Sequence, residues 1–374
     1  MSDDHLFVSC VRGLEPLLAE ELAELGVPDA REGFCGVYVS GNSHELIYRL
    51  NYGSRLASRI LLPLVAFGCH NRETLYKAAL RVDWNSVIPQ GRTFAIDANV
   101  SHEKLRHSLF AAQVVKDAIC DQLREKRGER PSVQVRDPDV QLNLFVHDAK
   151  GVISLDTSGA PLHRRGYRAR NVAAPLQETL GAAVLRLAGF RPEMSLCDPC
   201  AGGGTFLSEA YLMATRTPPA FFRRRFGFEE MAGFDRASWE MVRRVADDGR
   251  VAKSEARLVG CEVLREVYSI CTENLTGCGA RGVKVMCADF RRADLPRFDR
   301  IVTNPPHGLR LKGEEELYPQ IGDFIRDHLN ADGEAWLVIG EEGRPEAFGL
   351  KVVSTRRVSN GGQRCQIVRL SRAR

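Results

Sequence analysis

The sequence predicts an α/β protein in which a doubly wound, mainly parallel sheet fills the carboxyl-terminal half and an α+β region precedes it. From about residue 173 onward, short apolar segments alternate with longer segments of helical periodicity. That alternation is typical of strand–helix–strand crossovers. Before residue 173 the order is instead strand, helix and then several strands, which indicates a mixed, mainly antiparallel sheet. A chain of 374 residues has room for two or three domains of this kind.

The amino-terminal half reads as two successive blocks. Leucines with helical spacing predict a helix over residues 14–25 that ends at Gly26, and residues 36–40 alternate as a strand. The second block begins near residue 60. Its expected elements are a strand at 93–97, an amphipathic helix at 109–126 and strands at 132–136, 140–147 and 151–157.

The carboxyl-terminal half ends differently from the way it begins. Its expected strands are 195–197, 257–261, 283–287, 300–303 and 335–339, and its expected helices are 205–216, 262–276 and 316–329. Residues 351–358 and 363–370 then form a β-hairpin around Gly361 and Gly362. An antiparallel terminal hairpin on a parallel sheet is typical of class I methyltransferases rather than of dehydrogenases. We therefore expect a Rossmann-like, seven-stranded sheet with a terminal antiparallel hairpin.

Composition excludes several classes of protein. No apolar run approaches the roughly 20 residues that span a bilayer, and the acidic start MSDDHLF lacks the features of a signal peptide. The 11 cysteines are therefore expected to be reduced, in a cytoplasmic protein. Cys197 and Cys200 have C-x-x-C spacing, but no second pair or histidine cluster accompanies them, so no metal is expected.

A glycine-rich segment follows the first strand of the carboxyl-terminal half. Asp198 closes the strand, and Gly202-Gly203-Gly204-Thr205 turns into a helix. Glycine lets a ligand lie against the backbone, and nucleoside ligands bind at this point of a doubly wound sheet. Leu207 occupies the last glycine position of a dinucleotide motif, and a P-loop lysine is missing. The acid before the loop suits S-adenosylmethionine, which has a positive centre; a glycine turn without a ligand is the alternative.

Two later acids stand at the ends of the next two strands. Glu262 can accept hydrogen bonds from both hydroxyls of a ribose. Asp289 can accept one from an adenine amino group, and Phe290 could pack on the ring. Each acid alone would more often be a loop cap. Since the carboxyl ends of parallel strands share one edge, Asp198, Glu262 and Asp289 together predict a cofactor cleft.

A polar tetrapeptide, Asn304-Pro305-Pro306-His307, ends the fourth strand on the same edge. The Asn304 side-chain oxygen and the Pro305 carbonyl can both accept hydrogen bonds from an amino group on a planar ring. This would direct the nitrogen lone pair toward a methyl donor, and positioning would supply most of the catalysis. The two prolines fix the backbone, and His307 could stack on a base rotated out of its helix. The alternative is a plain turn after a strand.

The segment 157–172 carries four arginines and no acid after Asp156: Arg164, Arg165, Arg168 and Arg170. Guanidinium groups bind phosphates in a bidentate manner, so the cluster predicts contacts with RNA phosphates. A solvated linker is the alternative.

Several longer motifs resemble those of one family, the THUMP-domain RNA guanine-N2 methyltransferases. The likeness is closest to the amino-terminal half of the bifunctional bacterial 23S rRNA enzyme, with tRNA guanine-N2 enzymes as more distant relatives. It covers nearly the whole chain and rests on residues 13–22, 54–60, 130–133, 154–159, Leu162-His-Arg-Arg-Gly-Tyr-Arg168 and Ala174-Pro-Leu-Gln-Glu178. The family usually has tyrosine where His307 stands and aspartate where Glu262 stands.

The resemblance implies a domain plan and a set of site residues. The domains would be a ferredoxin-like subdomain at 1–58, a THUMP RNA-binding domain at 59–157, a basic linker at 158–172 and a Rossmann-like methyltransferase domain at 173–374. It implies that Pro175, Leu176 and Glu178 border the cofactor. With these, the expected cofactor-binding residues are Asp198, Pro199, Gly202, Gly204, Thr205, Glu262, Val263, Asp289 and Phe290.

The resulting hypothesis is a monomeric, S-adenosylmethionine-dependent enzyme that methylates the exocyclic N2 amine of a guanine in structured RNA, with 23S rRNA as the expected substrate. Three alternatives stay open on the sequence: a tRNA guanine-N2 methyltransferase, an N6-adenine RNA methyltransferase, and an RNA-binding ribosome assembly factor without catalytic activity. Neither a membrane nor a metal is an expected partner.

Overall fold

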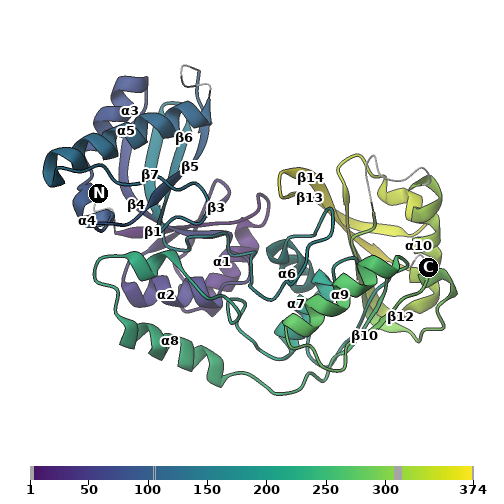
Figure 1. The fold of residues 1–374 in the computed structure, drawn as a ribbon. Coiled ribbons are helices and arrows are strands. Elements are labelled where there is room, and N and C mark those ends of the chain that lie inside the picture. Colours follow the sequence, from purple (N-terminus) through teal and green to yellow (C-terminus); the bar gives the residue numbers. More distant parts are fainter. Residues whose placement is uncertain (1–3, 104, 106, 307–313, 373–374) are drawn as a thin grey trace. The chain divides into compact units, whose positions relative to one another are not determined.

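The computed structural model describes residues 4–103, 105, 107–306 and 314–372. The chain divides into two compact units, which are described separately (Figure 1). Unit 1 comprises Met1–Cys10, Ala19–Leu162 and Arg224–Arg243. Unit 2 comprises Val11–Leu18, His163–Arg223 and Arg244–Arg374.

Unit 1 is built on one seven-stranded sheet with the strand order β2-β3-β1-β4-β7-β6-β5. The strands are β1 (His5–Ser9), β2 (Arg31–Gly33), β3 (Gly36–Ser40), β4 (Arg59–Gly68), β5 (Phe94–Ser101), β6 (Val140–His147) and β7 (Lys150–Asp156). Its helices are α2 (His44–Gly53), α3 (Arg72–Leu80), α4 (Trp84–Val87) and α5 (Ser108–Arg127), while α1 (Glu15–Glu24) begins in residues of unit 2. Because β1 pairs with β4, the two amino-terminal blocks share a single sheet.

The mixed sheet that the sequence predicts for this region is confirmed. β5 and β6 pair in parallel, whereas β7 pairs antiparallel with both of its neighbours, β4 and β6. Burial alternates along β6, so that every second residue faces the core. The apolar side of α5 packs against this face through Val114, Val115 and Ile119, and Gly128 ends the helix with φ of 77°.

The strand expected at 132–136 is wrong. Only a single bridge forms there, between Phe94 and Val133, and Val135 is 83% exposed. The side chain of Gln134 donates to the backbone carbonyls of Arg136 and Asp137, and Asp137 has φ of 53°. These local hydrogen bonds replace the sheet ladder and curl the segment into a turn. β4, which is the central strand of the sheet, was not predicted.

Unit 2 contains a second seven-stranded sheet, in the order β10-β9-β8-β11-β12-β14-β13. The strands are β8 (Ser195–Asp198), β9 (Arg257–Cys261), β10 (Lys284–Met286), β11 (Phe298–Thr303), β12 (Leu329–Gly340), β13 (Lys351–Asn360) and β14 (Gln363–Ser371). The helices are α6 (Glu178–Leu187), α7 (Thr205–Ala214), α9 (Arg265–Gly277) and α10 (Glu314–His328), with the short 3-10 helices η2 (Phe290–Arg292) and η3 (Pro345–Phe348). A third 3-10 helix, η1 (Gly227–Glu230), belongs to the segment that packs in unit 1.

This architecture confirms the expected Rossmann-like sheet with its terminal antiparallel hairpin. β8 lies between β9 and β11 and is parallel to both. β12 is parallel to β11, whereas β13 and β14 pair antiparallel at the end of the sheet. The carboxyl ends of β10, β9, β8 and β11 therefore meet at one edge, where ligands bind in open α/β sheets.

The segment 224–243 lies between elements of unit 2 in the sequence but packs in unit 1. The Trp239 ring, on helix α8 (Arg236–Asp248), contacts those of Tyr48 and Phe228 with centroids 5.8 and 4.9 Å apart. The Tyr48 hydroxyl accepts a hydrogen bond from the backbone N–H of Asp235 at 3.1 Å. The domain bounds expected from the sequence place this segment with residues 173–374, whereas in the structure it packs in unit 1.

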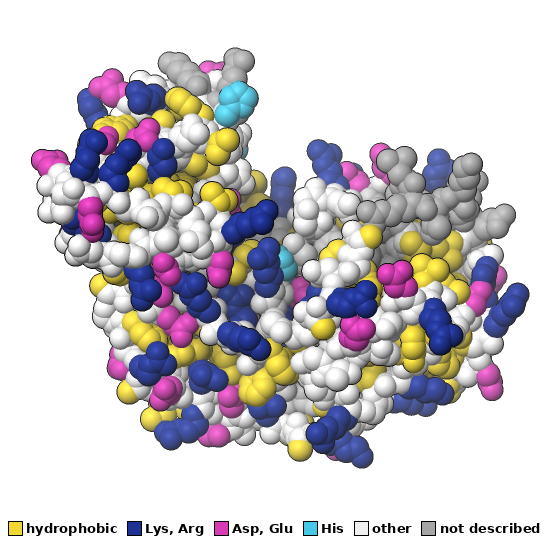
Figure 2. All heavy atoms as spheres, in the orientation of Figure 1, with side chains coloured by type: hydrophobic (Ala, Val, Ile, Leu, Met, Phe, Trp, Pro, Cys, Tyr) yellow, Lys and Arg dark blue, Asp and Glu magenta, His cyan; other side chains and the backbone are white. Residues whose placement is uncertain are grey.

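Charged side chains of both signs are intermingled over the visible surface of each unit (Figure 2). All 11 cysteines are free thiols. Within the described residues, no helix is both long and apolar enough to cross a bilayer.

Candidate active site

Four of the polar residues singled out in the sequence stand at the ends of adjacent strands of unit 2. Asp198 ends β8, Glu262 follows β9, Asp289 follows β10 and Asn304 follows β11. The order β10-β9-β8-β11 makes these strands consecutive neighbours in the sheet. The structure thus brings the expected cofactor acids and the expected catalytic amide to one edge.

The glycine loop after β8 has the backbone that only glycine adopts readily. Gly202 and Gly204 have φ of 51° and 80°. A Cβ on Gly204 would lie 2.8 Å from the Sγ of Cys271, so a side chain there would also clash with α9. Thr205 begins α7 directly after the loop. The loop therefore presents bare backbone at the strand edge.

Asp198 is fully buried beneath this loop. Its Oδ1 accepts a hydrogen bond from the backbone N–H of Cys200 at 3.1 Å. Burial raises the pKa of Asp198 to about 7, partly offset by the nearby Thr303 hydroxyl and this backbone N–H. The Thr303 hydroxyl faces the carboxyl without forming a hydrogen bond of standard geometry. A cationic group placed here would favour the charged form of Asp198.

Glu262 is held in place by two backbone donors. Its Oε2 accepts from the N–H of Gly202 at 3.0 Å, and its Oε1 accepts from the N–H of Leu264 at 2.9 Å. Each carboxylate oxygen has a second acceptor site, so both remain able to accept from a pair of vicinal hydroxyls. This arrangement fits a ribose. The adjacent Val263 is 63% exposed.

The Asp289 carboxylate is half-buried at the strand edge, whereas the Phe290 ring is buried. Asp289 forms an ion pair with Arg291, whose Nε lies 2.8 and 2.9 Å from the two carboxylate oxygens, and this hydrogen bonding holds the pKa of Asp289 below its usual range. An adenine amino group would have to share these oxygens with Arg291. Phe290 is buried in the core, where its ring forms a T-shaped pair with that of Phe324, with the centroids 5.4 Å apart.

The side-chain oxygen of Asn304 is a hydrogen-bond acceptor that no donor group contacts among the described residues. This atom, Oδ1, is buried, and the Oγ1 of the preceding Thr303 is also buried without a hydrogen-bond partner among those residues. Pro305 is buried and Pro306 is exposed. An unsatisfied buried carbonyl oxygen costs free energy, which a ligand with an N–H group would recover. His307 lies outside the described residues.

The first residue of α6 and the segment before it lie beside Thr205, whose hydroxyl donates to the Leu176 carbonyl at 3.3 Å. The Glu178 carboxylate is buried and pairs with the Nε of Arg168 at 2.8 Å, and burial raises its pKa. The Asn360 side chain, at the end of β13, donates to the carbonyl of Pro175 and accepts from the N–H of Gln177. Sequence patterns do not single out this asparagine, because beside Gly361 and Gly362 it is typical of a turn.

The structure corrects the expected role of two arginines. Arg165 is 2% exposed and pairs with the buried Glu209, which also accepts a hydrogen bond from the Tyr167 hydroxyl at 3.2 Å. Arg168 pairs with Glu178 in the interior. Both guanidinium groups are thus occupied in internal ion pairs rather than exposed to solvent. Of the cluster, Arg164 and Arg170 are exposed.

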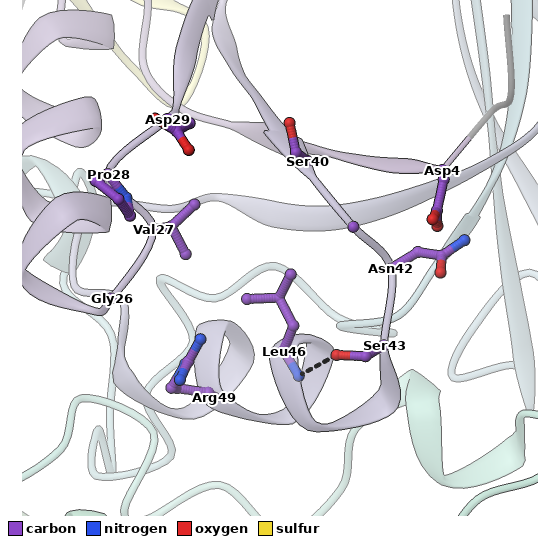
Figure 3. A pocket seen from close by; sticks show the side chains of 11 residues that line it. Asp4, Gly26, Val27, Pro28, Asp29, Ser40, Asn42, Ser43, Leu46 and Arg49 are labelled. Carbon is purple, nitrogen blue, oxygen red and sulfur yellow. Dashed lines mark hydrogen bonds between the residues drawn. The ribbon is translucent and has the colours of Figure 1, made fainter.

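A separate pocket lies in unit 1 (Figure 3). Its lining includes Asp4, Asp29 and Arg49, and Leu46 and Ser43 contribute from the start of α2. The Ser43 hydroxyl caps that helix by accepting from the N–H of Leu46 at 3.3 Å. None of the catalytic, cofactor-binding or RNA-binding residues predicted from the sequence lines this pocket.

Three families match successive parts of the chain. The first is described as the RlmL ferredoxin-like domain and matches residues 5–61. The second is the THUMP domain, at residues 69–156. The third is described as the RMKL-like methyltransferase domain and matches residues 165–368. These matches confirm the expected kinds of domain and their order.

Known proteins are similar over nearly the whole chain. A protein of Synechocystis named "Putative RNA methyltransferase slr0064" is 35% identical, with 97% of this chain and 95% of that protein covered. The "Ribosomal RNA large subunit methyltransferase K/L" of Methylococcus capsulatus is 36% identical over 96% of this chain. This chain spans about half (50%) of the length of that relative.

Solved structures share the fold. SMU.472, described as a putative methyltransferase complexed with SAH, superposes with a TM-score of 0.85 at 24% identity, covering 99% of this chain and 98% of that one. A possible methylase of Clostridium difficile 630 gives the same TM-score, 0.85, at 27% identity, with the same shares of the two chains covered.

Proposed function

Because the chain belongs to the family of RMKL-like methyltransferases that carry an amino-terminal THUMP domain, we propose that it is an S-adenosylmethionine-dependent RNA methyltransferase. We propose further that it methylates the exocyclic N2 amine of a guanine, and that the guanine lies in 23S rRNA. The name of the Methylococcus relative supports the choice of RNA.

The observation that carries this proposal is the unpartnered Oδ1 of Asn304 at the end of β11. This oxygen accepts hydrogen bonds and cannot donate them, so its partner must carry an N–H or O–H group. An exocyclic amine has two such hydrogens. β11 lies between β12 and β8, and the glycine loop that follows β8 is the proposed cofactor loop. The amine and the methyl donor would therefore meet at neighbouring strand ends.

The chain's own residues explain how the amine is made reactive. In guanine the N2 lone pair is delocalised into the ring. Hydrogen bonds from the amine to the Asn304 Oδ1 and the Pro305 carbonyl would draw the nitrogen toward sp³ geometry and direct its lone pair. The nitrogen loses a proton after the transfer, so no strong base is required. His307 is proposed to stack on the base.

The residues at the strand edge suit S-adenosylmethionine, which when bound supplies an electrophilic methyl group. The proposed contacts are the Asp198 carboxylate with the positive sulfonium region, Glu262 with the ribose, and Asp289 with the adenine. Gly202, Gly204 and Thr205 would offer backbone and hydroxyl contacts. Pro175, Leu176, Glu178, Pro199, Val263 and Phe290 would shape the walls.

We propose four parts of the chain: a ferredoxin-like subdomain at residues 1–58, a THUMP domain at 59–157, a linker at 158–172 and the catalytic domain at 173–374. The THUMP domain and the linker are the parts proposed to bind RNA. Within the linker, the exposed Arg164 and Arg170 are the proposed phosphate contacts. Arg170 already pairs with Glu273 at 3.4 Å, which weakens but does not block such a contact.

The test is nucleoside mapping of 23S rRNA and tRNA from cells with and without the gene. We expect one N2-methylguanosine to disappear from 23S rRNA and to return when the gene is restored. Restoration with the Asn304→Ala variant serves as the control for catalysis and should leave the site unmethylated. Loss of N6-methyladenosine, or of N2-methylguanosine from tRNA alone, would overturn the proposed substrate.

The same material tests whether the protein is an enzyme at all. Calorimetry with S-adenosylmethionine should show binding to the purified chain. No binding at millimolar cofactor would favour an RNA-binding assembly factor instead.

A further inference from the structure

One buried amide, that of Asn274 on α9, connects the linker to the glycine loop. The Asn274 side chain is 0% exposed. Its Oδ1 accepts from the backbone N–H groups of Ala169 and Arg170 at 2.9 and 3.1 Å. Its Nδ2 donates to the carbonyls of Arg170 and Gly203 at 3.1 and 3.0 Å. All four hydrogen-bonding sites of the amide are therefore in use.

Close backbone contacts hold both segments against the same helix. A Cβ on Gly277, at the end of α9, would lie 2.2 Å from the carbonyl oxygen of Tyr167. A Cβ on Gly204 would lie 2.8 Å from the Sγ of Cys271. The linker and the glycine loop thus rest on α9 on either side of Asn274.

The neighbouring Arg168 makes a second connection. Its Nη2 donates to the Oγ1 of Thr205 at 2.9 Å and to the carbonyl of Leu176 at 3.2 Å. Thr205 is the first residue after the glycines. Consecutive linker residues are therefore tied to the middle of the loop and to its end.

We propose that Asn274 is a positioning residue for cofactor binding, which orders the glycine loop by tying it to the linker. The inference rests on the proposed function for the identity of the ligand. Glycines lose more conformational freedom on ordering than other residues. Without the tie, binding would have to order the loop, and the affinity for the cofactor would fall. Asn274 lies outside the reacting groups, so the rate at saturating cofactor should change little.

The experiment compares three variants of the full chain. Asn274→Ala removes all four hydrogen bonds. Asn274→Asp keeps acceptors for the two linker N–H groups but loses the N–H donors to the carbonyls of Arg170 and Gly203. Asn51→Ala is the matched control, since Asn51 is also 0% exposed and its amide bonds Ile47, Thr157 and Ser158 within unit 1.

Two measurements are made on each variant: the Kd for S-adenosylhomocysteine by calorimetry, and hydrogen exchange of peptides that cover residues 169–170 and 202–204. We expect Asn274→Ala to raise the Kd about tenfold or more, as for roughly 1.4 kcal/mol of lost binding free energy, and to speed exchange in both peptides. Asn274→Asp should raise the Kd while residues 169–170 stay protected. Asn51→Ala should lower the Tm without changing the Kd.

Kinetics with RNA should show a raised KM for the cofactor and a kcat within about threefold of wild type, a split that a general loss of stability does not produce. An unchanged Kd in Asn274→Ala, or a Kd raised equally by Asn51→Ala, would overturn the inference. If the wild type binds no S-adenosylhomocysteine, the proposed function fails. The hydrogen-exchange data then still test whether Asn274 orders the glycine loop: exchange at residues 202–204 that is unchanged in Asn274→Ala refutes that role.

Discussion

At the scale of single residues, Asn304 is where the chemistry can be tested most directly. Replacing it with alanine removes the acceptor for the target amine but leaves the glycine loop and Glu262 untouched. We expect the turnover rate to fall by about 10²-fold or more, as for other lost transition-state hydrogen bonds. The affinity for S-adenosylmethionine should stay nearly unchanged. Turnover equal to that of the wild type would refute the role assigned to Asn304.

Asp198 gives a prediction about pH. Burial raises its pKa in the folded protein to about 7, from the ordinary value of 3.8. The folded state therefore holds a proton that the unfolded state has lost, and stability falls as the pH rises from about 4 through about 7. Asp198→Asn cannot ionise, so its Tm relative to wild type should be higher at pH 8 than at pH 5.

The same substitution should weaken binding of the cationic cofactor at pH 8, because the negative charge is lost. Thermal unfolding at the two pH values, with calorimetry at pH 8, measures both effects. A Tm difference that does not depend on pH would show that the Asp198 carboxyl ionises normally.

At the scale of elements, the linker acts as part of the interior of unit 2. Arg165→Ala would leave Glu209 buried without its ion-pair partner. We expect the free energy of unfolding to fall by about 3–5 kcal/mol. Arg164→Ala, at the adjacent exposed position, should change it by less than about 0.5 kcal/mol. Denaturant unfolding separates the two, and equal stability of both variants would contradict the ion-pair role of Arg165.

The glycine loop offers a second prediction at this scale. Gly204→Ala combines an unfavourable φ of 80° with a contact to Cys271, whereas Gly279 has φ of 70° and open space around its Cα. A non-glycine residue in this conformation costs about 1–2 kcal/mol by itself. Gly279→Ala should lose only that amount, and Gly204→Ala should lose more and bind the cofactor more weakly. Chemical denaturation and calorimetry of both variants provide the comparison.

At the scale of the whole molecule, a segment that interrupts unit 2 in the sequence completes the core of unit 1. Trp239 is 4% exposed and packs on Tyr48, Tyr52 and Phe228. Trp239→Ala should cost about 3–5 kcal/mol and speed hydrogen exchange in α2. Met241, on the same helix, is 51% exposed, and Met241→Ala should leave exchange unchanged. Faster exchange confined to unit 2 would contradict this assignment.

Local sequence patterns predict the parallel sheet, its terminal hairpin and the strand-end positions of Asp198, Glu262, Asp289 and Asn304. These features depend on local periodicity and on glycine and proline, which act within a few residues. The expected strand at 132–136 failed because a side-chain hydrogen bond, which periodicity does not encode, replaced its ladder.

Which polar side chains pair with each other inside the protein follows from tertiary packing alone. Arg165 and Arg164 are neighbours with the same chemistry, yet one is buried against Glu209 and the other is exposed. Asn274 and Asn360 likewise gain their roles from partners more than 70 residues away. A buried charge or amide is stable only with a hydrogen-bond or ion-pair partner. These partners come together when distant elements pack, so a local sequence pattern does not predict them.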